Sequence, residues 1–299
     1  MLKFWLLIGL LLAGGHAVLG QAPAAIAIVA AAAADSLPLV RVVPFERPGA
    51  TSANPAGLLY VADGRQNIVQ LTPDGQRLQM YSPAVRGRVA SLDAGFTGKV
   101  LAFYDDRQAL VLFDRFLSPI TTLQFADFPA TAERLIRAAT LAPDGTIWLY
   151  DERQLALVRL DPRDPSTATA VPLDLVLTSP KSDIRALHVW QNQLYLVDRA
   201  TGIYVFDIFG AFSRRIALPG LLNVHFRGDE LFFLTADARA VQFEALYTSA
   251  APPRRLLLPA APNGQQWTAV GGTASDGLYL VCPAGIGVTA APDSPRPDR

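Results

Sequence analysis

The sequence has few of the residues that build metal and nucleophile sites. Cys282 is its only cysteine, and its three histidines are His16, His188 and His225. One cysteine cannot form an internal disulfide, and neither a His-Glu-x-x-His nor a paired Cys-x-x-Cys spacing occurs. A Gly-x-Ser-x-Gly elbow and a phosphate-binding glycine loop are also missing, and Gly271-Gly272 is interpreted as a turn before a strand. The sequence therefore predicts no catalytic residue and no metal site.

The chain also lacks an excess of either charge. Lys+Arg and Asp+Glu both number 26, so the formal net charge is zero. Lysine occurs only as Lys3, Lys99 and Lys181, and the arginines are not gathered in a basic run. A protein with this balance has no global field that attracts nucleic acid or an anionic membrane, so neither is expected as a partner.

The N-terminus has the pattern of an export signal. Lys3 precedes an apolar core from Phe4 to Ala13, and small residues before Gln21 suit a signal peptidase. We expect a signal peptide over 1–20, a flexible Ala/Pro-rich linker over 21–36 and a disordered tail over 291–299. The mature protein is then periplasmic or extracellular without a transmembrane span, with attachment to the outer membrane left open. The alanine-rich stretch Ala22 to Ala34 offers the alternative of an uncleaved anchor.

An apolar strand followed by a turn recurs along the chain. Six segments repeat at steps of 37 to 47 residues, the spacing of four-stranded propeller blades. They are Leu59–Asp63, Leu101–Asp105, Ile147–Asp151, Leu194–Asp198, Leu231–Thr235 and Leu278–Cys282. Leu39 to Val43 is an apolar strand without a hairpin partner, and the sixth unit stops after Gly285–Thr289. The sequence predicts an all-β fold over 37–290, a six-bladed β-propeller closed by its N-terminal strand.

These phrases carry a family resemblance. Leu59–Asp63, Leu194–Asp198 and Gly202–Phe212 resemble blades of the NHL and YWTD propellers, and residues from about Thr51 to Thr289 are similar to exported bacterial propellers. The resemblance implies the fold and a protein- or ligand-binding role, and it brings no active site. In YWTD-like blades it also implies that the repeated aspartates, Asp63, Asp105, Asp151 and Asp198, accept hydrogen bonds from turn backbone.

Three functions remain open at this point. The first is a non-catalytic exported scaffold that binds another envelope or extracellular protein, or a glycan. The second is a calcium-dependent lactonase-like hydrolase, for which Asn54, Asn192 and Asn223 are available ligands. The lack of a Glu in an early innermost blade strand counts against this function. The third is a small-molecule sensor that uses the central funnel. Fold alone does not decide among the three. We favour the first, with no cofactor expected and Ca²⁺ kept as the alternative.

Two features are candidate contact sites. In blades one to three an arginine stands two residues after the repeated aspartate, and in blades four and five an arginine lies within two residues of that position. We expect these five arginines around the funnel mouth as a ligand-binding ring: Arg65, Arg107, Arg153, Arg199 and Arg239. The alternative is that each arginine pairs with a nearby acid such as Asp106 or Glu152. Phe209 lies in a turn and either packs against a neighbouring blade or is exposed as a protein-contact residue.

Overall fold

The computed structural model describes residues 37–95, 98–179, 182–247, 252–273 and 277–291. The predicted signal peptide, the linker and all of the predicted tail except residue 291 lie outside these residues. Apart from two 3₁₀ turns, Phe125–Asp127 and Pro262–Gly264, the regular structure of the described residues is β-strand. None of the described segments forms a helix long and apolar enough to cross a membrane.

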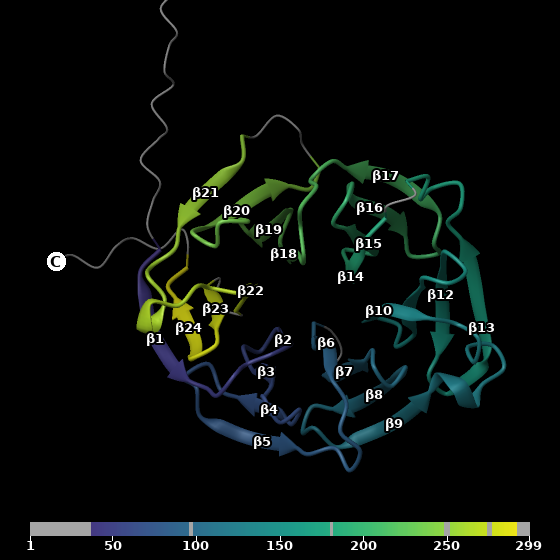
Figure 1. Ribbon diagram of the computed structural model, residues 1–299, viewed down its shortest axis with the longest axis horizontal. Helices are drawn as coiled ribbons and strands as arrows, with labels where there is room; N and C mark the ends of the chain where they lie inside the picture. The colour runs from purple at the N-terminus through teal and green to yellow at the C-terminus, as the bar shows by residue number, and fades with distance from the viewer. Residues whose placement is uncertain (1–36, 96–97, 180–181, 248–251, 274–276, 292–299) are drawn as a thin grey trace, which may run out of the picture. The chain divides into compact units, whose positions relative to one another are not determined.

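The described strands form six antiparallel sheets of four strands, arranged around a central axis as propeller blades (Figure 1). In blades one to five, consecutive strands run from the channel to the rim. They are β2 (Thr51–Ala53), β3 (Leu59–Ala62), β4 (Ile68–Leu71) and β5 (Arg77–Tyr81); β6 (Val89–Asp93), β7 (Lys99–Tyr104), β8 (Ala109–Asp114) and β9 (Pro119–Gln124); β10 (Ile136–Leu141), β11 (Ile147–Asp151), β12 (Ala156–Asp161) and β13 (Asp164–Pro172); β14 (Ile184–Trp190), β15 (Gln193–Asp198), β16 (Gly202–Asp207) and β17 (Phe212–Ile216); and β18 (His225–Arg227), β19 (Glu230–Leu234), β20 (Ala240–Ala245) and β21 (Arg254–Leu257).

Blade six joins the two ends of the propeller. Its strands β22 (Ala269–Gly272), β23 (Leu278–Cys282) and β24 (Gly285–Thr289) are completed by β1 (Leu39–Pro44) from the start of the described chain. The strand β1 pairs antiparallel with β24, from Leu39 opposite Thr289 to Pro44 opposite Gly285. The predicted six-bladed fold and its closure by the N-terminal strand are confirmed.

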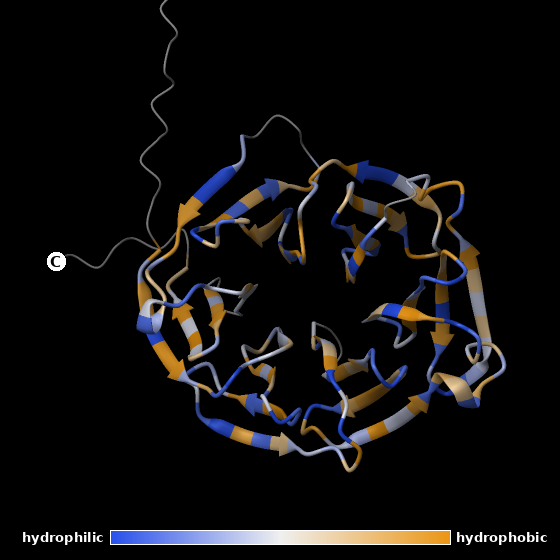
Figure 2. Ribbon diagram, in the orientation of Figure 1, coloured by the Kyte–Doolittle hydropathy of each residue, from blue (hydrophilic) through white to orange (hydrophobic). Residues whose placement is uncertain are grey.

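The hydrophobic core lies between neighbouring blades. Tyr60 and Ile68 of blade one pack in one cluster with Phe113 of blade two, and equivalent clusters join each following pair until blade six meets blade one. The second strands are buried over most of their length because both of their faces meet another sheet. Hydrophilic residues appear on outermost strands such as β17 and β21, which face solvent (Figure 2).

The repeated aspartates hold the turns between second and third strands. Asp63 Oδ1 accepts hydrogen bonds from the backbone N–H groups of Arg65 and Asn67, at 2.8 and 2.9 Å. In later blades the same aspartate also receives a bond from the segment entering its own blade. Asp151 accepts from Leu135 N at 3.1 Å, and Asp198 accepts from Asp183 N at 2.8 Å. The structural role expected for these carboxylates is confirmed.

Candidate functional site

The central channel contains two connected cavities. The larger, of about 640 Å³, lies where the first strands begin and where turns join second to third strands; we call it the mouth cavity. The smaller, of about 280 Å³, lies towards the opposite ends of the first strands; we call it the distal cavity. They share five lining residues: Thr51, Leu92, Asp93, His188 and Asn223. The channel is therefore a continuous site to which all six blades contribute.

Charged pairs from three successive blades line the mouth cavity. Arg88 forms an ion pair with Asp105 in blade two. In blade three Arg137 Nε lies 2.7 Å from Glu152 Oε2, and in blade four Arg185 Nε lies 2.8 Å from Asp183 Oδ1. All three guanidinium side chains are at least 42% exposed. Glu152 is as exposed as its arginine, whereas Asp105 and Asp183 are only 14% and 29% exposed, so it is the guanidinium groups that remain accessible to a ligand.

The five arginines predicted from the sequence lie on this face but line neither cavity of the described channel. Arg199 pairs with Asp183 at 2.7 Å, as the ion-pair alternative expects. Arg107 donates to the Val85 carbonyl oxygen and lies over the Tyr104 ring, while Arg153 donates to the Glu133 carbonyl oxygen. The acids suggested as partners, Asp106 and Glu152, bind other groups. Glu152 pairs with Arg137, and Asp106 accepts from the backbone N–H of Arg88. A binding role for the five arginines stays a prediction.

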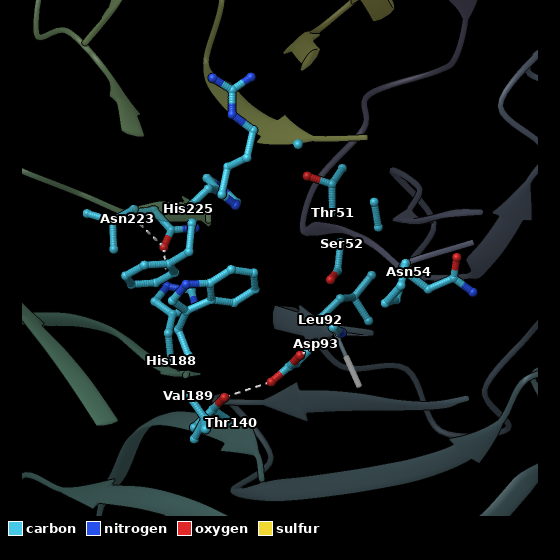
Figure 3. Close-up of a pocket in the computed structure, with 18 of the residues that line it drawn as sticks. Thr51, Ser52, Asn54, Leu92, Asp93, Thr140, His188, Val189, Asn223 and His225 are labelled. Atoms are coloured by element: carbon cyan, nitrogen blue, oxygen red, sulfur yellow. Dashed lines mark hydrogen bonds between the residues drawn. The ribbon is translucent and has the colours of Figure 1, made fainter. Parts of the chain in front are cut away.

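One wall of the distal cavity is polar. Asp93 Oδ2 accepts a hydrogen bond from the Thr140 hydroxyl at 2.7 Å and from Leu141 N at 2.9 Å, linking blade two to blade three (Figure 3). Its Oδ1 accepts from Gly95 N at 3.1 Å. Ser52 Oγ accepts from Ala94 N, so its hydroxyl proton stays available to the cavity. This carboxylate is held in a fixed position by three donors.

Two histidines stand across the cavity from that wall. His188 Nε2 lies 2.7 Å from Asn223 Oδ1 (Figure 3). The same Asn223 atom accepts from Val224 N, which identifies it as the oxygen; His188 therefore donates from Nε2 and keeps Nδ1 as an acceptor. Neither ring nitrogen of His225 has a hydrogen-bond partner among the described residues. Both histidines line the distal cavity.

The surroundings keep both imidazoles neutral. Burial lowers the pKa of His188, against the opposing effect of its bond to Asn223 and of the Asp93 charge. Burial, together with the neighbouring His188, lowers the pKa of His225 to about 3. Their ring centroids are 6.3 Å apart. A neutral imidazole carries one donor and one acceptor, so these side chains can form hydrogen bonds of both kinds at neutral pH.

Aromatic rings continue this histidine wall. Trp190 stacks on Phe226 with 5.8 Å between centroids and 17° between planes, and its indole N–H donates to the Gly228 carbonyl oxygen. In blade six Gly271 lies inside β22, so its interpretation as a turn is wrong. A Cβ at Gly271 would come within 2.0 Å of the Tyr279 ring, so the glycine leaves the space that this tyrosine fills beside the channel.

Phe209 lies at the other face, in the turn between third and fourth strands of blade four. Its side chain is 75% exposed, so the alternative that it packs against a neighbouring blade is wrong. Asp207 Oδ1 accepts from Phe209 N at 2.9 Å and from Ala211 N at 2.8 Å, which fixes the turn beneath the ring. Phe116 occupies the same turn of blade two and is 53% exposed.

The described residues contain no group of three or more His, Cys, Asp or Glu side chains placed to hold a metal ion. Of the three asparagines considered as calcium ligands, Asn54 and Asn223 line the distal cavity and Asn192 does not. Asn54 Oδ1 accepts from Leu58 N at 2.9 Å, and Asn223 holds His188. The channel asparagines therefore shape the protein's own turns and histidine wall.

The sequence analysis missed the charged residues that line the mouth. Arg88, Arg137 and Arg185 all lie at the starts of first strands, beside Val89, Ile136 and Ile184. The sequence repeat does not show that these arginines share a position, because the first strands are its least regular part. In each of them the pairing with the second strand shifts register near the arginine. An arginine beside the first apolar residue of three successive first strands was the signal that could have identified them.

Comparison with known proteins places the chain by fold alone. No protein-family model matches the sequence, and no curated protein matches it. A streptogramin B lyase structure shares 12% identity with a TM-score of 0.59, over 83% of this chain and 94% of that one. A catalytically inactive histidine-to-alanine variant of virginiamycin B lyase from Staphylococcus aureus, solved with quinupristin, shares 11% identity (TM-score 0.54, 83% and 97% covered). The Pan2 WD40 domain of Neurospora crassa shares 11% (0.58, 84% and 91%).

Proposed function

We propose that this chain is an exported, non-catalytic β-propeller that binds another envelope protein or a glycan through its mouth cavity. The observation that carries the proposal is the set of three exposed arginines, each paired with a carboxylate, around a hollow of about 640 Å³. Rim charges of both signs favour specific, salt-sensitive recognition of a charged partner. Arg65, Arg107, Arg153, Arg199 and Arg239 would extend the positive field of this face around the hollow.

The state of the channel side chains supports binding over catalysis. Asp93 is occupied by three hydrogen bonds, and His188 is tethered to Asn223. A general base needs a basic group placed to take a proton from substrate, with a pKa near the working pH. The pKa of His225 is instead lowered to about 3, by desolvation of the half-buried ring and by the neighbouring His188. The proposal needs no cofactor, and Phe209 offers a second contact surface at the opposite face.

Export is supported by the N-terminal pattern of Lys3 followed by the apolar run from Phe4 to Ala13. Cell fractionation with N-terminal sequencing of the mature chain tests location, and mild cross-linking followed by affinity capture from the envelope tests binding. We expect a mature chain that begins near Gln21 and a reproducible cross-linked partner or glycan. A chain retained in the cytoplasm, or one that captures nothing in the envelope, would contradict the proposal.

A further inference from the structure

The distal cavity lies between two walls of different chemistry. Blades four and five supply ring surfaces, Trp190 stacked on Phe226 with His188 and His225 beside them. The wall across the cavity supplies oxygen atoms, among them the Ser52 hydroxyl and the Asp93 carboxylate (Figure 3). A molecule that fits here needs a flat face for the rings and polar groups at its edge.

Hydrogen-bonding groups of both kinds remain open to the cavity. His188 keeps Nδ1 as an acceptor, and the Asn223 amide nitrogen has no partner among the described residues. The two ring nitrogens of His225 add one donor and one acceptor while the ring is neutral. Hydroxyl groups both donate and accept, so a polyhydroxylated ring matches this mixture better than a molecule with one kind of group.

The charge of the cavity favours an uncharged ligand. Burial lowers the pKa of both histidines, so neither carries a positive charge for an anion at neutral pH. Arg227 lies 3.3 Å from Glu230 and is thus paired. Among the described residues that line this cavity the carboxylate is Asp93, which already accepts three hydrogen bonds and does not need a cation to stabilise it.

The size of the cavity limits the ligand to about one ring. Its volume of about 280 Å³ is at the lower end for ligand pockets, which run from about 300 to 1,000 Å³. Blade six contributes Gly272 and Tyr279 to the lining. The connection to the mouth cavity lets a chain attached to the bound ring leave towards solvent.

We propose that the distal cavity binds a neutral sugar ring, either a free monosaccharide or the terminal residue of a glycan. The ring lies against Trp190, and its hydroxyl groups bond to His188, His225, Asn223 and the Asp93 wall. This inference deepens the proposed function and rests on it only for the channel being a binding site. Sugar binding by the purified protein is measured without the envelope partner, so the two can fail separately.

The test is calorimetric titration of the purified chain with glucose, galactose, mannose and N-acetylglucosamine, and with oligosaccharides ending in each. We expect saturable binding of at least one of them, competitive among sugars that share a terminal ring. Tighter binding of the oligosaccharide identifies a glycan end, and equal or weaker binding identifies a free sugar. Tryptamine, a cationic aromatic amine, is titrated as the contrasting ligand. Absence of saturable binding to any of the sugars, or binding of tryptamine alone, would overturn the inference.

Substitutions at Gly272 and Trp190 test whether the sugar binds in the distal cavity. Gly272 lines the cavity, and Gly272→Val adds bulk to this part of its wall; a Cβ there would lie 3.5 Å from the nearest atom of the Phe232 ring, an ordinary contact, so the fold should tolerate it. We expect it to lower affinity at least about tenfold, and Trp190→Ala to do the same, with Trp190→Phe restoring most of the binding. Phe116→Ala removes an exposed ring on the surface and is the matched control, with affinity unchanged. A Gly272→Val protein that melts and binds sugar like the parent would overturn the placement.

Discussion

Gln108 of blade two holds Ile136 of blade three by two hydrogen bonds. Its Oε1 accepts from Ile136 N at 2.7 Å, and its Nε2 donates to the Ile136 carbonyl oxygen at 2.9 Å. Gln66 makes the corresponding contact from blade one, where its Oε1 accepts from Val89 N at 2.9 Å. Both glutamines have positive φ, 48° and 68°. The glutamine thus explains the Arg-Gln pair in blades one and two, where it joins each blade to the next. In blade three Gln154 instead accepts from Arg134 of the same blade.

The first prediction follows from this difference between the two glutamines. Gln108→Asn shortens the side chain by one methylene and breaks two inter-blade bonds as well as the bond from Nε2 to the Asp105 carbonyl oxygen, whereas Gln66→Asn breaks one inter-blade bond. Asparagine tolerates the positive φ at both sites. We expect Gln108→Asn to lower the free energy of unfolding by about 1–3 kcal/mol and Gln66→Asn by less. Chemical denaturation of both proteins measures this, and equal effects would show that the second bond contributes nothing.

Closure of the ring gives the second prediction. A chain of residues 37–299 should melt cooperatively, and one of residues 46–299 should aggregate or melt at a much lower temperature. The shorter chain exposes the edge of β24 and loses the buried Leu37 and Phe45 side chains, each worth about 1.5–3 kcal/mol. Differential scanning calorimetry compares the two chains. If they had equal melting temperatures, β1 would not close the propeller.

The third prediction concerns the exposed Phe209. Because its ring is 75% exposed, Phe209→Ser should change the free energy of unfolding by no more than about 0.5 kcal/mol. Phe206→Ser, three residues earlier at a fully buried position, is the control and should cost about 3–5 kcal/mol. If Phe209 contacts a partner, its serine variant should capture less of it from the envelope. Undiminished capture would remove the residue from the binding surface.

The fourth prediction is an acid-dependent loss of stability from His225. Desolvation of this half-buried, cavity-lining side chain lowers its pKa to about 3, while an unfolded histidine titrates near about 6.5. Between these values the unfolded chain takes up a proton that the folded chain does not, so stability falls as pH falls through this window. His225→Gln removes the contribution and should flatten the decline in melting temperature from pH 7 to 4. Parallel curves for the two proteins would contradict a depressed pKa.

The sequence predicted the architecture because the repeat is carried by second strands, which are almost wholly apolar and end at Asp63, Asp105, Asp151 and Asp198 in blades one to four. Closure was predictable because the apolar strand Leu39 to Val43 had no hairpin partner and the sixth unit lacked a fourth strand, so the first could complete the second. The candidate site was harder to predict. The first strands are short and irregular, and Arg88, Arg137 and Arg185 come to line one cavity only when their blades are arranged around the channel. Phe209 could not be assigned because exposure depends on the surface that surrounds the turn.

The most direct test of the account compares two sets of arginines at the channel face. One protein carries Arg88→Gln, Arg137→Gln and Arg185→Gln, and the other carries Arg65→Gln, Arg107→Gln and Arg153→Gln. For each protein, binding of the captured envelope partner, or of heparin as an anionic glycan probe, is measured across a salt series. Removing the three cavity-lining arginines should weaken binding at least about tenfold and flatten its salt dependence, with a smaller effect for the outer set. Unchanged affinity of the first variant at low salt would contradict the claim that the mouth cavity is the recognition surface.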